Sequence, residues 1–209
     1  VRRFNHQEAR TFSPTRFGVQ SWPSLPQAEY LAPEGYEVAY RTNAVTRHGE
    51  HGNALLARWP IGDVGHHDVS DHRFEQRGLL HVPVRWRQTE VHVVVVHLGL
   101  IHASRVRQAE RVAQLVAEQI PAGAPVVVAG DFNDWNEKLD HILASVGLHR
   151  AGPADQARVA TYPSLIPVLA LDRVYMRGMR CESVMVPRGS TWARLSDHLP
   201  LVVELDLQG

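Results

Sequence analysis

Short apolar runs separated by polar turns dominate the chain after residue 50, and this pattern predicts a series of buried strands. Residues 78–86 and 89–98 are two such runs, with a turn at Arg87-Gln88 between them. Val93–Val96 is apolar at both alternating positions, which indicates a strand that is covered on both faces. Further strands are predicted at residues 53–57, 125–129, 170–176, 181–186 and 199–207.

In two segments the hydrophobic period changes to that of a helix. Between Ser104 and Ile120 the apolar residues recur at helical spacing, and Pro121 ends the predicted helix. Residues 134–146 follow the same spacing, and Gly147 stands where the C-terminal end of a helix is expected. The sequence therefore predicts two helices, each following a buried strand.

The remaining segments predict loops and complete the expected fold class. Residues 1–50 are punctuated by prolines and residues 62–76 are polar, so loops are predicted in both, with one short strand at Tyr36–Tyr40. Strands then outnumber helices, and several strands follow one another directly. This order predicts a single α+β domain over residues 1–209, in which mixed sheets pack face to face with helices outside.

Composition limits the class of protein further. A chain of 209 residues with 44% apolar side chains can bury a core without disulfides. The 22 basic and 22 acidic residues balance, which excludes a strongly basic coat for nucleic acid and an acidic tail, but not a local basic groove. The single cysteine, Cys181, excludes an internal disulfide and a four-thiolate zinc site.

Polar side chains stand where several predicted strands end. Asp131 and Asn133 follow a buried strand, and their spacing on an extended chain would direct both into one site while Phe132 points into the core. Together with Asp197 they offer oxygen ligands, which suit Mg²⁺ or Mn²⁺ better than Zn²⁺. Each of these motifs alone is also typical of an ordinary turn or a helix cap, so the hypothesis depends on the whole set.

Two histidines and one more acid accompany these oxygen ligands. His97 follows Val93–Val96, Asp172 precedes another predicted strand, and His198 follows Asp197 directly. Imidazoles can donate hydrogen bonds to a phosphoryl oxygen or move protons near neutral pH. A cation and imidazoles directed at the charge that develops on a phosphoester, with a carboxylate to activate water, are sufficient for hydrolysis.

These residues resemble the endonuclease/exonuclease/phosphatase superfamily, which includes pancreatic-type deoxyribonuclease, abasic-site endonucleases, neutral sphingomyelinases and inositol-polyphosphate phosphatases. The resemblance spans about residues 51–207, and it is most specific where the third and fifth of its segments occur together. The segments, in order, are His51–Ile61, His97–Leu100 with Arg105 and Gln108, Gly130–Asp134, Leu171–Val174 and Ser196–Leu201.

The resemblance implies a four-layer α/β sandwich of two packed mixed sheets flanked by helices. It also implies roles for the site residues. Asp131 and Asn133 would position and deprotonate the attacking water, and Asp197 would hold the divalent cation. His198 would contact the phosphate or act as a base, oriented by Asp172, and His97 would be a second contact to the phosphate or the leaving group.

The N-terminal region departs from the pattern of the superfamily. Its members begin with a strand that ends in a metal-site Asn, a helix, and a second strand that ends in Gln-Glu. Gln7-Glu8 has the same letters but follows polar residues, so we interpret this match as accidental. We expect the missing Glu to lie just upstream of Val1, in a longer protein whose first one or two strands and first helix this chain lacks.

Several interpretations of function stay open at this point. We expect a monomeric metal-dependent phosphodiesterase, of nuclease type first, with a phospholipid or small phosphoester as the alternative substrate. A non-catalytic binding protein is a third hypothesis if the metal-ligand Glu is absent. The residues considered for substrate contact are Trp135, Trp192, and a basic strip of Arg85, Arg87, Arg173 and Arg194.

The segment from Gly65 to His72 is a separate candidate, because three histidines and two aspartates lie close together in it. It could bind a metal of its own. An exposed polar loop in a histidine-rich protein explains the same letters, and this is the interpretation that we favour.

Overall fold

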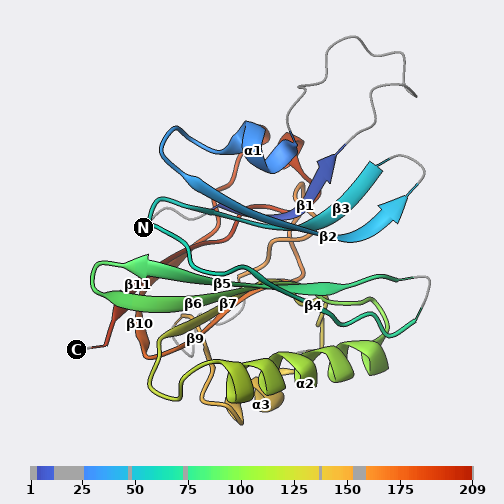
Figure 1. Ribbon diagram of the computed structural model, residues 1–209. Helices are drawn as coiled ribbons and strands as arrows, with labels where there is room; N and C mark the ends of the chain where they lie inside the picture. Colours follow the sequence, from blue (N-terminus) through green and yellow to red (C-terminus); the bar gives the residue numbers. More distant parts are fainter. Residues whose placement is uncertain are drawn as a thin grey trace.

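A computed structural model describes residues 4–11, 26–46, 49–72, 75–136, 138–152 and 159–208 (Figure 1). Its strands are β1 (Phe4–Thr11), β2 (Glu37–Thr46), β3 (Gly49–Ala57), β4 (Gly65–Asp68), β5 (Gly78–Trp86), β6 (Thr89–His97), β7 (Val126–Asp131), β8 (His149–Arg150), β9 (Asp172–Arg177), β10 (Met179–Met185) and β11 (Val202–Leu207). Its helices are α1 (Gln27–Leu31), α2 (His102–Gln119), α3 (Asp140–Ala144) and α4 (Ser190–Leu195).

The centre of the fold is a six-stranded mixed sheet in the order β4-β5-β6-β7-β9-β8. β6 and β7 are parallel, and α2 forms the crossover between them, whereas the other neighbouring pairs are antiparallel. α2 buries the apolar stripe that predicted it, including Ala109, Val112 and Val116. The predicted helix and the predicted buried strands of this region are therefore confirmed.

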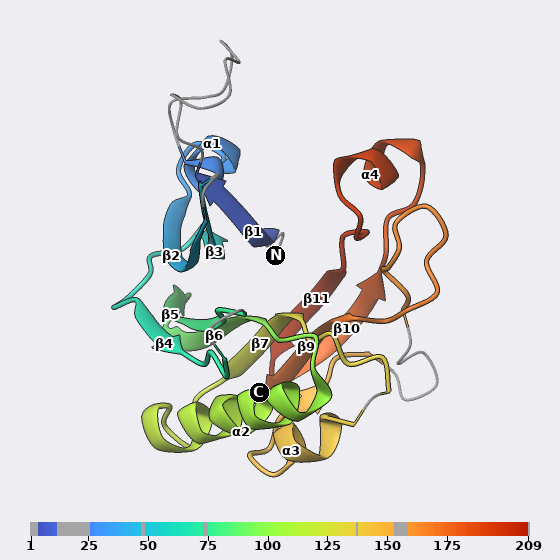
Figure 2. The ribbon, with the colours of Figure 1, turned by 90° about the vertical axis from the view of Figure 1, so that its right-hand side faces the viewer.

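A second layer covers the face of the central sheet opposite α2 and α3 (Figure 2). It consists of two separate antiparallel sheets, with the orders β1-β3-β2 and β10-β11. The predicted α+β fold with sheets packed face to face and helices outside is confirmed. The second layer differs from the expectation, because in the described part of the chain it is antiparallel and split in two.

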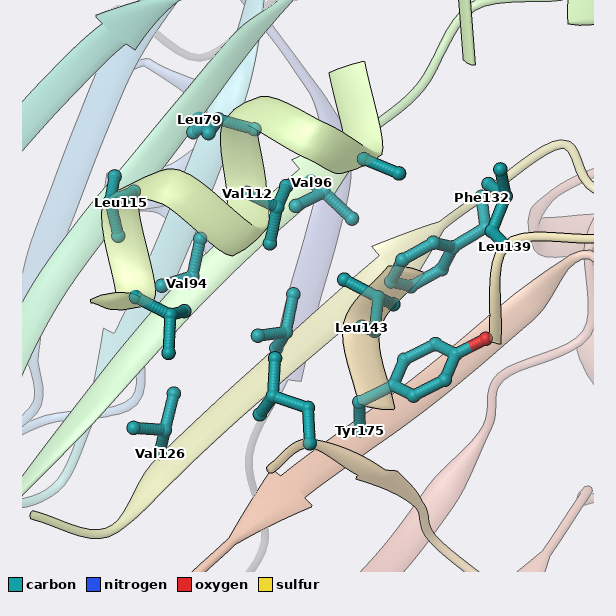
Figure 3. Close-up of a cluster of buried hydrophobic side chains, with 14 of the residues drawn as sticks. Leu79, Val94, Val96, Val112, Leu115, Val126, Phe132, Leu139, Leu143 and Tyr175 are labelled. Atoms are coloured by element: carbon teal, nitrogen blue, oxygen red, sulfur yellow. The ribbon is translucent and has the colours of Figure 1, made fainter. Parts of the chain in front are cut away.

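One hydrophobic core lies on each face of the central sheet, because successive side chains of β5, β6 and β7 point alternately to the two faces. The core under α2 and α3 includes Val94, Val96 and Phe132, as Figure 3 shows, so Phe132 points into the core as predicted. The other core includes Val93 and Val95, which pack with residues of β2, β3, β10 and β11. This double coverage explains why Val93–Val96 is apolar at every position.

The N-terminal quarter contains more strand than the sequence pattern predicted. β1 pairs with β3 where only loops were expected, and β2 extends well beyond Tyr36–Tyr40. β1 lacks an apolar alternation, so its pairing with β3 left no hydrophobic signal. Gln7 and Glu8 lie at the irregularity of this pairing between His6 and Ala9. That their match to the superfamily is accidental, and that further strands precede Val1, stay predictions.

The predicted helix at 134–146 is wrong in its first half, because α3 covers only Asp140–Ala144. Asp134 is fully buried, and its carboxylate accepts a hydrogen bond from the Leu139 N–H at 3.1 Å. The same carboxylate pairs with the Arg173 guanidinium at 3.0 Å. These contacts hold Asp134 outside a helix, although the apolar spacing of the segment is helical.

No helix of the described residues is long and apolar enough to cross a membrane.

A pair of buried histidines lies on the α2 face of the central sheet. His81 Nε2 is 3.0 Å from His92 Nδ1, and the two rings are stacked with centroids 5.2 Å apart. Burial and the neighbouring His92 lower the pKa of His81 to about 4. Both rings are therefore neutral in the folded protein at pH 7, and a proton on His81 would be poorly solvated.

We expect this pair to make the fold sensitive to acid. The folded pKa of His81 is below that of an unfolded histidine, so unfolding takes up a proton between pH 6.5 and about 4. The free energy of unfolding should fall by about 2 kcal/mol from this group across that range. Urea denaturation at several pH values should show a weaker pH dependence in His81→Leu and an unchanged one in His149→Gln, an exposed histidine. Equal pH dependence in all three proteins would contradict the expectation.

Candidate active site

Strand register brings three of the predicted residues into one row across the central sheet. His97 on β6 is opposite Asp131 on β7, and Asp131 is opposite Asp172 on β9. Residues in register on neighbouring strands point to the same face. His97 Nε2 lies 3.7 Å from Asp131 Oδ2, so the first two side chains meet directly.

His198 reaches the same row from the turn before β11. Its Nδ1 is 2.7 Å from Asp172 Oδ2, and its Nε2 is 4.0 Å from Asp131 Oδ2. The Tyr162 ring packs against the imidazole with centroids 4.8 Å apart. Four predicted residues, which come from distant parts of the sequence, therefore converge around the Asp131 carboxylate.

The Asp131 carboxylate is unusual because it is almost fully buried. Burial, together with the negative charge of Asp172, raises its pKa to about 6. The hydrogen bond from the Asn133 N–H to Oδ1, at 2.8 Å, acts in the opposite direction. A carboxylate with this pKa is ionised at neutral pH and is a stronger proton acceptor than an ordinary aspartate.

The pKa of His198 is raised. Burial alone would lower it, but the hydrogen bond with Asp172 and the negative charges of Asp172, Asp131 and Asp197 outweigh that effect. Asp172 also fixes the orientation of the ring through Nδ1, so Nε2 is the nitrogen directed toward Asp131. The arrangement is an imidazole that is oriented by one carboxylate and adjacent to another.

Asn133 lies beside Asp131, but for a different reason from the one predicted. β7 ends at Asp131, and Asn133 has a left-handed φ of 49°, so strand alternation does not apply to it. A tight turn instead buries Asn133, and its Nδ2 donates a hydrogen bond to the Leu98 carbonyl at 2.9 Å. Asn133 thereby ties the loop after β6 to the loop after β7.

Asp197 is the predicted residue that lies furthest toward solvent. Its side chain is exposed, and Oδ1 accepts a hydrogen bond from the Ser196 hydroxyl at 3.3 Å. Its backbone carbonyl accepts the Ser164 N–H at 2.7 Å, which fixes the turn before His198.

The site contains oxygen donors of the kind that a divalent metal ion needs. Asp131, Asn133 and Asp197 carry the oxygen donors that a hard cation prefers, and the raised pKa of Asp131 marks a place where positive charge would be stabilised. In the described ranges, however, no three or more His, Cys, Asp or Glu side chains are grouped so that they could hold a metal ion. These residues therefore supply part of a ligand set.

Thr161 belongs to the site, although sequence reasoning did not find it. Its side chain is buried, and Oγ1 donates a hydrogen bond to Asp172 Oδ2 at 2.5 Å. Asp172 Oδ2 is therefore held between the Thr161 hydroxyl and the His198 ring. A threonine in a loop gives no periodic signal, and tertiary contacts such as the hydrogen bond from the Leu199 N–H to the Thr161 carbonyl bring it here.

Gly130 allows the close approach of β6 and β7 immediately before the site. Its φ is 149°, and a Cβ built on it would lie 1.8 Å from the Val96 carbonyl oxygen. Only glycine fits between these strands without moving the backbone. The register that aligns His97 with Asp131 therefore depends on the absence of a side chain at residue 130.

The predicted basic strip is not assembled at the site. Arg173 is fully buried, where it pairs with Asp134 and hydrogen-bonds Tyr175 Oη at 3.2 Å, so its role is structural.

Arg85 and Arg87 lie at the β5–β6 turn, at the opposite end of β6 from His97, roughly 20–25 Å along the strand. Of the four arginines, Arg194 on α4 is the one near the turn that carries His198.

The two suspected tryptophans differ in their surroundings. Trp135 is exposed, and the guanidinium carbon of Arg105 lies 5.0 Å from the centroid of its ring. Arg105 is itself buried, and its Nη1 donates hydrogen bonds to the carbonyls of Gly99 and Leu100, in the loop after His97. Trp135 is therefore placed at the edge of the site by this arginine. Trp192 is half-buried on α4.

The histidine-rich segment forms a β-strand at the edge of the sheet. Gly65–Asp68 pairs with β5 as β4, which corrects the expected loop. His66 Nε2 is 3.0 Å from Asn43 Oδ1, and Asp71 forms an ion pair with Arg107. These contacts engage two of the polar side chains of the segment within the fold, and the interpretation that the segment does not bind a metal stays a prediction.

Comparison with known proteins identifies the family. Residues 13–198 match the Endonuclease/Exonuclease/phosphatase family, and the chain belongs to this family. It is 40% identical over 194 residues to the uncharacterized protein YbhP of Escherichia coli K12, and this match covers 90% of the chain and 76% of YbhP. Members of the family are generally hydrolases that depend on a divalent metal.

Solved structures show the same fold at low sequence identity. An endonuclease/exonuclease/phosphatase family protein from Leptotrichia buccalis has a TM-score of 0.75 and 13% identity, over 98% of this chain and 87% of that one. The human Nocturnin catalytic domain with a bound sulfate anion has a TM-score of 0.66 and 19% identity, over 83% of this chain and 73% of that one. The predicted resemblance to this family is confirmed.

We expect Gly130→Ala to destabilise the protein by at least about 3 kcal/mol, because the new methyl group would overlap the Val96 carbonyl. Gly123→Ala is a matched control, since a Cβ there meets nothing within 4 Å. It should change the free energy of unfolding by less than about 0.5 kcal/mol. Chemical denaturation measures both changes, and equal stability of the two variants would contradict the assignment.

We expect Thr161→Val to lower kcat by about tenfold with little change in KM. Asp172 would lose the hydrogen bond from the Thr161 hydroxyl, which helps to hold its carboxylate in place. Thr161→Ser keeps the hydroxyl and should retain most of the activity. A purely structural role would instead lower thermal stability and reduce kcat in both variants alike. Steady-state kinetics and thermal melting of the two variants therefore distinguish these roles.

Proposed function

We propose that this protein hydrolyses phosphodiester bonds with an activated water molecule and a divalent metal ion. The observation that carries the proposal is the convergence of His97, Asp131, Asp172 and His198, in which a buried carboxylate lies between two imidazoles. A binding module does not need a buried, oriented set of this kind, and burying two acids side by side is costly. Membership of a family of hydrolases supports the same class of reaction.

The geometry supports a division of roles among these side chains. Asp131 is ionised above about pH 6 and accepts a proton from the attacking water. The Nε2 atoms of His97 and His198 lie 3.7 Å and 4.0 Å from Asp131 Oδ2, where they can donate hydrogen bonds to phosphoryl oxygens. Asp172 orients His198 through Nδ1, and Thr161 orients Asp172. Asn133 holds the Asp131 carboxylate in place through its backbone N–H.

We propose Mg²⁺ or Mn²⁺ as the metal, with Asp197, Asp131 and Asn133 as its ligands in this chain. When bound, the ion supplies positive charge that stabilises the negative charge developing on the phosphate. Oxygen donors support the choice of a hard cation over zinc. An exposed Asp197 is accessible to an ion and to substrate together.

The structure favours the alternative substrate over a nucleic acid. A nuclease needs a basic track along the phosphate backbone, but Arg173 is buried and Arg85 and Arg87 lie at the far end of β6. A phospholipid headgroup or another small phosphodiester requires no such track. We therefore rank a small or lipid phosphodiester first and a nuclease second.

We expect Asp131→Asn to reduce phosphodiester hydrolysis by at least about a hundredfold, because the amide cannot accept the proton of the water. The substitution keeps an oxygen for the Asn133 N–H, so the turn and the fold should survive. Hydrolysis of bis(p-nitrophenyl) phosphate, with and without Mg²⁺ or Mn²⁺, measures the loss. Asp63→Asn, at an exposed position, is the matched control.

Thermal melting in the presence of each metal gives a readout that does not depend on turnover, since an ion that binds the folded state raises the melting temperature. Full activity of Asp131→Asn would contradict the role of Asp131. Full activity in excess chelator would contradict the proposed metal dependence.

A further inference from the structure

An apolar ridge projects from the protein next to the site. Four of the five most exposed large hydrophobic side chains of the described residues fall in two neighbouring segments. Leu165, Ile166 and Val168 are 79%, 73% and 68% exposed, and Leu195 on α4 is 70% exposed. We call these four residues the apolar ridge. The fifth, Val45 on β2, lies in a different part of the fold.

The two segments of the ridge are fixed to each other. Ser164 Oγ donates a hydrogen bond to the Ala193 carbonyl at 3.1 Å, and the Ser164 N–H donates one to the Asp197 carbonyl at 2.7 Å. Figure 2 shows α4 and the segment before β9 side by side, projecting beyond the ends of β10 and β11 and away from α2 and α3. The two segments therefore project together, and the ridge is held in place although its side chains are largely exposed.

The charged side chains within the two segments of the ridge are basic, and the exposed Asp197 follows the second segment directly. Residues 159–170 and 185–196 contain no Asp or Glu, but they contain Arg188 and Arg194, which are both exposed. Trp192 is half-buried on α4 between these two arginines. Protruding aliphatic side chains with a tryptophan and flanking arginines are suited to the boundary between the headgroups and acyl chains of an anionic bilayer.

The ridge is connected directly to the site residues. Tyr162, three residues before Leu165, packs on the His198 ring, and Asp197 and His198 come immediately after Leu195 and Ser196. A surface that docks on the ridge therefore lies close to the row of Asp131, Asp172 and His198. A docked bilayer would present its phosphodiester headgroups at that position.

We propose that the apolar ridge inserts into the surface of an anionic phospholipid bilayer and brings headgroup phosphodiesters to the site. The docking stands on the exposed residues alone, whereas the hydrolysis of the headgroup rests on the proposed function. A bilayer fits better than a protein partner or a second copy of the chain, because the two segments project beyond the ends of β10 and β11 and carry exposed aliphatic side chains beside exposed arginines. The arginines match the negative charge of the lipid.

The test is cosedimentation with vesicles, using the Asp131→Asn variant so that no lipid is consumed. Vesicles of phosphatidylcholine with phosphatidylglycerol should bind the protein, and pure phosphatidylcholine should bind it less. We call the double substitution Leu165→Asp and Ile166→Asp the ridge variant. It should weaken vesicle binding by at least about tenfold, because two aliphatic side chains no longer insert into the membrane. Adding Val45→Asp, on an equally exposed valine outside the ridge, should leave binding unchanged.

Activity is then compared in the chain with an intact Asp131. The ridge variant should hydrolyse bis(p-nitrophenyl) phosphate at the normal rate but lose at least about tenfold on phospholipid in vesicles. No vesicle binding by the parent protein, or equal binding by the ridge variant, overturns the docking. A dimer in analytical ultracentrifugation that the ridge variant abolishes, without vesicle binding, assigns the ridge to a second copy and also overturns it. If the chain with an intact Asp131 has no phosphodiesterase activity but still binds vesicles, the proposed function is rejected and the docking is supported.

Discussion

The backbone register of β6, β7 and β9 is the constraint on which the site depends. It places His97, Asp131 and Asp172 at equivalent positions of three neighbouring strands. The parallel pairing of β6 and β7 requires the crossover through α2, and Gly130 lets the two strands approach each other just before the row ends. A shift of one residue in any of these strands would turn a side chain of the row to the α2 face.

The cost of the row is balanced by the residues around it. Asp131 is buried beside the half-buried Asp172, and the negative charge of Asp172 raises the free energy of ionised Asp131. His198, Thr161 and the Asn133 N–H offset part of this cost with hydrogen bonds. The neutral apolar cores on both faces of the sheet supply the stability that the polar row does not.

Much of the fold and the site could be predicted, because buried strands and the residues at their ends leave a clear pattern. The continuous apolar run at Val93–Val96 marked a strand between two layers, and the polar residues after it and after the strand ending at Asp131 marked the site. Side chains used by tertiary contacts left no such pattern. Arginine is usually a surface residue, but Arg173 is buried in an ion pair with Asp134. Thr161 reaches Asp172 through the folding of a loop, which has no periodic pattern. β1 pairs through its backbone, which periodicity does not report.

The division of the second layer gives the two halves of the site different mechanical supports. His97, Asp131 and Asp172 are rooted in the six-stranded sheet, whereas His198 precedes β11, which pairs only with β10 among the described strands. No ladder of backbone hydrogen bonds joins β10 and β11 to the described strands of the central sheet, so the position of His198 depends on side-chain contacts, among them its hydrogen bond with Asp172 and the packing of Met179 and Leu205 in the second core. The proposed chemistry would then depend on how this pair of strands packs on the central sheet, because that packing sets the distance between His198 and Asp131.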